Sequence, residues 1–174
     1  MLTLILGGAR SGKSRLAQRL AAAAARVTYI ATAEAGQDPE MVARIERHRA
    51  DRPSSWRTIE EPLALADAVE CAAADAVIID CLTIWLSNLF FEHRDAAREL
   101  LEEAARAEIQ RIAAAAQQFH VILVSNELGS GTVPEPAVTR AFRDTQGLLN
   151  QWAAEIADEV ILTVAGLPLY LKTK

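Results

Sequence analysis

The chain has 174 residues, of which 51% are hydrophobic and 24% are charged, and its formal net charge at pH 7 is -5. This length and composition predict one compact domain over residues 1–174 and exclude a disordered chain. The acidic balance gives no global positive field for nucleic acid. The sequence contains no run of eighteen apolar residues, the length needed to span a membrane, and no signal-like segment opens it. We therefore expect a cytoplasmic protein that does not bind nucleic acid and does not span a membrane.

A phosphate-binding loop is predicted directly after the first strand. The apolar run of residues 2–6 leads into Gly7-Gly8-Ala9-Arg10-Ser11-Gly12-Lys13-Ser14, which fits G-x-x-x-x-G-K-[ST], and helix formers follow. In such a loop backbone N–H groups surround phosphate oxygens, Lys13 reaches the terminal phosphates and the Ser14 hydroxyl ligates Mg²⁺. We predict a nucleotide site here; the alternative is a chance match in a glycine-containing turn.

The second predicted strand, residues 26–31, is β-branched and aromatic. Thr32, Ala33 and Glu34 follow at its C-terminal end, which is the edge where parallel α/β sheets bind ligands. These three residues are candidates for nucleotide contact, and an ordinary strand-to-helix loop is the alternative.

A helix is predicted from Asp38 and Pro39 to about residue 49. The spacing of Met41, Ile45 and His48 puts the three on one helix face. Arginines, whose forked guanidinium groups match phosphate oxygens, gather around His48 at positions 44, 47, 49, 52 and 57. For the arginines the alternative is a solvated helix face, and for His48 it is a hydrogen-bonded core histidine.

A carboxylate is predicted at the tip of a central strand. Residues 76–79 are apolar and are followed by Asp80, which in a phosphate-loop fold belongs near Ser14 and holds Mg²⁺; the alternative role is as N-cap of the next helix.

Before this strand we predict an extended piece over residues 56–62 and a helix over 63–74. Glu60 and Glu61 could bind ribose or base, or be surface acids at the helix start. Cys71 and Cys81 are expected to be small buried residues.

The rest of the chain alternates helices and strands. Helices are predicted over residues 82–91, 95–118 and 136–157, and strands over 120–126, 159–165 and 167–172. Asn126 and Glu127 fall at the ligand edge, and the polar loop of residues 129–134 suits a lid or a grip on a second substrate. The pattern predicts a three-layer α/β, P-loop NTPase-like domain with a mainly parallel sheet and an antiparallel C-terminal edge strand.

Five motifs together resemble the bifunctional adenosylcobinamide kinase / adenosylcobinamide-phosphate guanylyltransferase family. They are the loop of residues 7–14, Tyr29-Ile30-Ala31-Thr32-Ala33, Arg44-Ile45-x-x-His48-Arg49, Arg52-Pro53-x-x-Trp56-Arg57-Thr58-x-Glu60 and Asn126-Glu127-x-Gly129. The resemblance covers nearly the whole chain. It implies phosphorylation of adenosylcobinamide by GTP or ATP and then transfer of GMP from GTP to the phosphate, with release of pyrophosphate, in cobalamin biosynthesis.

The resemblance also assigns residues. His48 maps onto the family's covalent guanylyl-histidine, Lys13 is the second expected catalytic residue, and Ser14 and Asp80 are the expected Mg²⁺ ligands. The implied nucleotide contacts are Gly7, Gly8, Ala9, Arg10, Ser11, Gly12, Lys13, Ser14, Thr32, Ala33, Glu34, Arg49, Ala50, Asp51, Arg52, Glu60 and Asp80. The family further implies a homo-oligomer, typically a trimer.

Two other functions compete with this one. A kinase for another small molecule would leave His48 structural, and a GTPase-type switch would bind GTP without covalent chemistry. Against the switch, no N-K-x-D sequence follows a strand, and Asp80-Cys81-Leu82-Thr83 lacks the glycine of a D-x-x-G turn. Arg47 stands where some family members have a second histidine, so this region offers one candidate nucleophile.

Overall fold

The computed structural model describes residues 1–34, 39–50 and 52–173; for residues 39, 40, 41, 44 and 48 it describes the backbone alone. The strands are β1 (Leu2–Gly7), β2 (Val27–Ala31), β3 (Arg57–Glu60), β4 (Ala76–Asp80), β5 (His120–Asn126), β6 (Glu159–Val164) and β7 (Leu167–Lys172). The helices are α1 (Lys13–Ala21), α2 (Pro39–Ala50), α3 (Leu65–Glu70), α4 (Leu82–Glu92), α5 (Arg98–Ala115) and α6 (Ala137–Ile156).

The strands of the described residues form one seven-stranded sheet in the order β3-β2-β4-β5-β1-β6-β7. All neighbours are parallel except β6 and β7, which confirms the mainly parallel sheet and the antiparallel edge strand. β5 lies between β1 and β4, with Gly7 opposite Asn126 and Asp80 opposite Val124. The loop after β1 and the carboxylate that ends β4 therefore lie at the same edge of the sheet, one strand apart.

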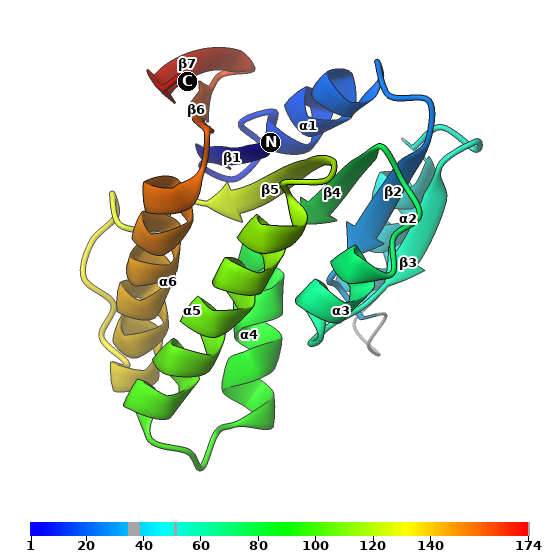
Figure 1. Ribbon diagram of the computed structural model, residues 1–174. Coiled ribbons are helices and arrows are strands. Elements are labelled where there is room, and N and C mark those ends of the chain that lie inside the picture. The colour runs from blue at the N-terminus through cyan, green and yellow to red at the C-terminus, as the bar shows by residue number, and fades with distance from the viewer. Residues whose placement is uncertain (35–38, 51, 174) are drawn as a thin grey trace.

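Helices cover both faces of the sheet (Figure 1). Alternate residues of β4 show the division, because Val77 and Ile79 pack with the cluster formed by α3, α4, α5 and α6, whereas Ile78 packs with Leu16 and Ala17 of α1. Such alternation follows from the two-residue period of a strand. The α/β, P-loop-like fold expected from the sequence is thus confirmed. The core fixes the positions of β1 and β4, which end at the loop and at Asp80.

Two local predictions were wrong. The helix predicted over residues 63–74 is limited to Leu65–Glu70, because turns formed by backbone hydrogen bonds flank it, from Leu65 N to Leu63 O and from Ala72 N to Val69 O. Cys71, expected to be buried, is exposed at the end of this short helix. Among the described residues, no helix has both the length and the apolar content needed to cross a membrane.

Candidate active site

The loop between β1 and α1 has a backbone that needs glycine at two positions. Gly7 and Gly12 have φ values of 154° and 98°, in the region that L side chains avoid. A Cβ on Gly7 would also lie 2.5 Å from Ser11 Oγ and 2.6 Å from Thr163 O. By contrast Gly8, Ala9 and Arg10 are exposed, so this part of the loop is open to a ligand.

Contacts from neighbouring strands hold the loop from behind. Gly166 N donates to Ser11 O at 2.9 Å, and Ser11 Oγ lies 2.8 Å from Thr163 Oγ1. On the other side, Glu127 N donates to Gly7 O at 3.1 Å. The side chain of Ser11 is therefore used inside the protein, and the β6–β7 turn and the end of β5 fix the shape of the loop.

The Lys13 side chain folds over this loop. Its ammonium donates to Gly7 O at 2.9 Å and to Gly8 O at 2.6 Å, and the residue is 8% exposed. Lys13 begins α1, and Ser14 follows at the helix N-terminus, where the helix dipole favours an anion. The Lys13 ammonium, the exposed backbone of the loop and the N-terminus of α1 therefore surround one position, which is suited to a phosphate chain.

Asp80 ends β4 next to this position. The Tyr29 hydroxyl donates a hydrogen bond to Asp80 Oδ2, and burial together with the Asp80 charge raises the pKa of Tyr29, so the phenol stays protonated. Burial and the same carboxylate raise the pKa of the Cys81 thiol to about 11, and the charge of Lys13 opposes that rise. Lys13 and Asp80 thus act electrostatically on the same residue.

A cavity of about 80 Å³ opens beside Asp80, at the ends of β2, β3 and β4. The Arg52 guanidinium lies 3.8 Å above the centroid of the Tyr29 ring, and Arg49 forms an ion pair with Glu60. The lining residues are Tyr29, Ala31, Ala33, Ile45, Arg49, Arg52, Glu60, Asp80, Cys81 and Ile84. Five predicted contacts therefore meet at one cavity, which has an aromatic wall, two guanidinium groups and two carboxylates.

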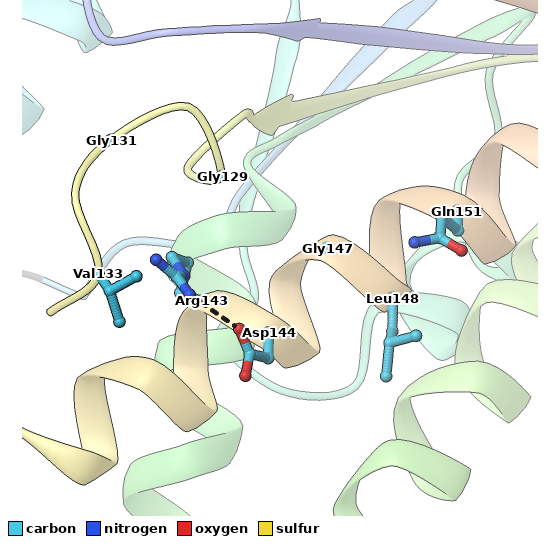
Figure 2. Close-up of a pocket in the computed structure, with 8 residues that line it drawn as sticks. All are labelled: Gly129, Gly131, Val133, Arg143, Asp144, Gly147, Leu148 and Gln151. Carbon is cyan, nitrogen blue, oxygen red and sulfur yellow. Dashed lines mark hydrogen bonds and ion pairs between the residues drawn. The ribbon is translucent and has the colours of Figure 1, made fainter.

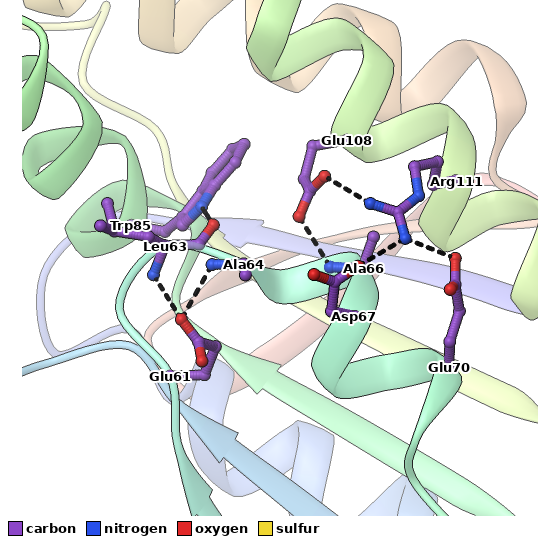
Figure 3. Close-up of polar contacts among 9 residues, drawn as sticks. All are labelled: Glu61, Leu63, Ala64, Ala66, Asp67, Glu70, Trp85, Glu108 and Arg111. Atoms are coloured by element: carbon purple, nitrogen blue, oxygen red, sulfur yellow. Dashed lines mark hydrogen bonds and ion pairs between the residues drawn. The ribbon is translucent and has the colours of Figure 1, made fainter.

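The two adjacent glutamates have different roles. Glu60 lines the cavity, whereas Glu61 Oε1 accepts hydrogen bonds from Leu63 N at 2.9 Å and Ala64 N at 2.8 Å just before α3 (Figure 3). Trp85 Nε1 donates to Leu63 O at 2.8 Å in the same segment. The sequence left open whether these acids bind a ligand or belong to the helix start. Glu61 stabilises the turn before α3, and Glu60 faces the cavity.

Other predicted contacts are placed differently. Thr32 is fully buried, and its Oγ1 is 2.9 Å from both the backbone N and O of Cys81, so its side chain is used to hold the end of β4. Glu34 and Ala50 are exposed. Asp38 and Asp51 lie outside the described residues, as does the side chain of His48, so their predicted roles stay predictions.

Sequence reasoning missed five of the lining residues, which are Tyr29, Ala31, Ile45, Cys81 and Ile84. Tyr29 could have been found from its position, because it lies in β2 opposite Ile78 and its polar end needs a partner when buried. The other four are apolar or weakly polar and carry no signal of their own.

The residues around Asp80 fit a magnesium ion that arrives with a nucleotide. Within the described part of the chain, no group of three or more histidine, cysteine, aspartate and glutamate side chains could hold a metal without help. Mg²⁺ commonly binds through one or two protein oxygens, waters and substrate phosphates. The Ser14 hydroxyl and the Asp80 carboxylate are donors of the right kind for such a shared site.

Replacing Tyr29 with phenylalanine is expected to raise the Mg²⁺ concentration needed for half-maximal activity by roughly three- to tenfold, because a hydrogen bond to a charged group contributes about 1.5–3 kcal/mol, part of which positions Asp80. The KM for the nucleoside triphosphate at saturating Mg²⁺ should change less. Mg²⁺ titrations of the initial rate measure the effect. Tyr170→Phe, at the exposed tyrosine of β7, is the matched control, and equal Mg²⁺ dependence in both variants would contradict the assignment.

Comparison with known proteins places these features in a family. Residues 3–171 match the family described as cobinamide kinase / cobinamide phosphate guanyltransferase. The chain is 50% identical over 179 residues to the bifunctional adenosylcobalamin biosynthesis protein CobP of Pseudomonas aeruginosa, covering 99% of this chain and 98% of that protein. It is also 41% and 42% identical to the proteins named CobU of Escherichia coli and Salmonella typhimurium, covering 99% of this chain and 100% of each relative.

Proposed function

Because this chain belongs to the cobinamide kinase / cobinamide phosphate guanyltransferase family, we propose that it phosphorylates adenosylcobinamide and then transfers GMP from GTP to the new phosphate by way of a guanylyl group on His48. The chain is an enzyme of adenosylcobalamin biosynthesis by its family and its bifunctional relatives. The covalent intermediate, the order of the steps and the products are the proposal.

One observation carries the proposal of a guanylyl-histidine. Ile45 and Arg49 of α2 both line the cavity beside Asp80, and position 48 is three residues after the first and one before the second. Residues three and four apart share a helix face. Position 48 therefore belongs to the face of α2 that borders the site, which supports a role for this histidine as nucleophile.

The kinase step needs positioning more than covalent chemistry. The hydroxyl oxygen of the aminopropanol arm attacks the γ-phosphorus, the bond to the β–γ bridging oxygen breaks, and the nucleoside diphosphate leaves while the hydroxyl proton is lost. Lys13 and the open backbone of Gly8 and Ala9 hold the phosphates in line for this attack. Bound Mg²⁺ would add charge neutralisation between Ser14 and Asp80.

The guanylyl step has two balanced parts. A neutral imidazole nitrogen of His48 attacks the α-phosphorus of GTP, and the bond to the α–β bridging oxygen breaks to release pyrophosphate. A phosphate oxygen of adenosylcobinamide phosphate then attacks the same phosphorus, the P–N bond breaks, and the histidine is restored. Arg49 and Arg52, at the cavity, are suited to the charge that develops on the phosphoryl oxygens.

We further propose that copies of the chain associate, as a trimer by resemblance to the family. β7 supports association, because this edge strand is exposed along its length and carries Leu167 at 70%, Leu169 at 56% and Leu171 at 56% exposure. Light scattering coupled to size exclusion gives the mass of the assembly directly.

Since both reactions consume nucleoside triphosphates, we propose the cytoplasm as their compartment.

A product time course tests the proposed function. The enzyme is mixed with Mg²⁺, GTP and adenosylcobinamide, the corrinoids are separated, and their masses are measured by mass spectrometry. We expect the phosphate ester first and the GDP conjugate later, with one pyrophosphate for each conjugate. Phosphate ester alone would reduce the function to a kinase, and hydrolysis of GTP with unchanged corrinoid would support a switch instead.

A further inference from the structure

An open hollow of about 550 Å³ lies between α6 and the loop that follows β5 (Figure 2). Its volume falls in the range of about 300–1,000 Å³ that ligand sites usually have. The lining residues are Gly129, Gly131, Val133, Arg143, Asp144, Gly147, Leu148 and Gln151. None of these described residues belongs to the phosphate loop or to the cavity beside Asp80, so the hollow is a separate place for a ligand.

One face of α6 forms the floor of the hollow. Asp144, Gly147, Leu148 and Gln151 follow the i, i+3, i+4, i+7 spacing of a single helix face. The adjacent face is anchored to the sheet, since Gln146 Nε2 donates to Ser125 Oγ at 3.0 Å and Asn150 Nδ2 donates to Asn126 O at 3.0 Å. These bonds fix the hollow relative to the end of β5.

Gly147 is not explained by the fold. It lies in the interior of a 20-residue helix, where glycine costs about 1 kcal/mol relative to alanine. Among the described residues, no atom other than those of its chain neighbours and its own helix backbone lies within 4 Å of a Cβ built on Gly147, so packing inside the chain does not require the missing side chain. Gly131, across the hollow, has the same open surroundings. Close approach by a group from outside the chain would account for both.

The hollow also lies close to the phosphate loop. The backbone of Glu127 donates to Gly7 O at 3.1 Å, and its side chain accepts from Gly129 N and Ser130 Oγ, both at 2.6 Å. The same bonds keep the pKa of Glu127 below its ordinary value. One residue thus joins the phosphate loop to the loop that borders the hollow.

We propose that this hollow binds the corrin ring system of the acceptor, which deepens and rests on the function proposed above. A corrin is broad and rimmed with amides, which Gln151 and the Arg143–Asp144 pair can meet by hydrogen bonds, while Leu148 and Val133 contact its apolar edges. Gly131 and Gly147 leave room for a rigid ring that a larger side chain at either position would exclude. The acceptor arm then extends past Glu127 toward the phosphate loop.

Filling the hollow tests the proposal. Leucine at position 147 is a good helix former whose side chain enters the open space, so Gly147→Leu should raise the KM for adenosylcobinamide about tenfold or more and leave the KM for GTP unchanged. Gly147→Ala should have a smaller effect. Thr139→Leu, on an exposed part of α6 outside the hollow, is the control and should match the parent.

A second measurement separates this proposal from the proposed function. Labelling of the protein by GTP that carries a radioactive α-phosphate needs no acceptor, so Gly147→Leu should label as the parent does. An unchanged acceptor KM would overturn the corrin site, and so would an equal loss of labelling and acceptor turnover. A changed molecular mass in light scattering would also overturn it, because the hollow would then be an interface between copies.

Discussion

Replacing Lys13 with alanine is expected to lower kcat/KM by about a thousandfold or more for both the kinase and the guanylyl step, because one cation serves the same phosphate chain in each. The ammonium is the buried cation folded over the Gly7 and Gly8 carbonyls. Steady-state rates with adenosylcobinamide and, separately, with adenosylcobinamide phosphate measure the two losses.

Folding has to be checked beside these rates. Removing the ammonium leaves two loop carbonyls without this donor, so we expect a loss of about 1–2 kcal/mol in the free energy of unfolding, too little to unfold the protein. Arg19→Ala removes an exposed cation at the other end of α1 and should keep both activities. If Lys13→Ala lowered one activity and spared the other, two separate nucleotide sites would be needed.

Replacing His48 with alanine is expected to abolish the guanylyl step and to change the kinase step by no more than a few fold, because only the first needs the nucleophile. The kinase assay uses adenosylcobinamide with γ-labelled GTP, and the guanylyl assay uses adenosylcobinamide phosphate with α-labelled GTP. His93→Ala, which removes an exposed histidine at the end of α4, should keep both activities. Retained guanylyl transfer in His48→Ala would remove this residue from the mechanism.

The sequence predicted the phosphate loop because its signal is local. A strand, a glycine-rich turn and a helix start all lie within about twenty residues, and each has its own pattern. The terminal carboxylate of β4 was found in the same way, since Asp80 directly follows four apolar residues. The fold class followed from the alternation of such segments.

What the sequence could not provide depends on contacts between distant segments. The Tyr29–Asp80 hydrogen bond exists because β2 pairs with β4, and the insertion of β5 between β1 and β4 is a matter of strand order. Glu60 and Glu61 are neighbours of the same type, and only the turn into α3 separates their roles. The sequence pointed to the 129–134 loop as a lid or a grip on a second substrate, but it did not show that this loop borders one face of α6, where nothing in the sequence pattern marks Gly147.

The central claim is that GMP is carried on His48, and covalent labelling tests it most directly. The protein is incubated with Mg²⁺ and GTP labelled at the α-phosphate, in parallel with γ-labelled GTP, and is then denatured and separated, with His48→Ala alongside. We expect acid-labile, base-stable label from the α position only, absent from the variant. A protein that binds GTP and takes up no α-label would contradict it.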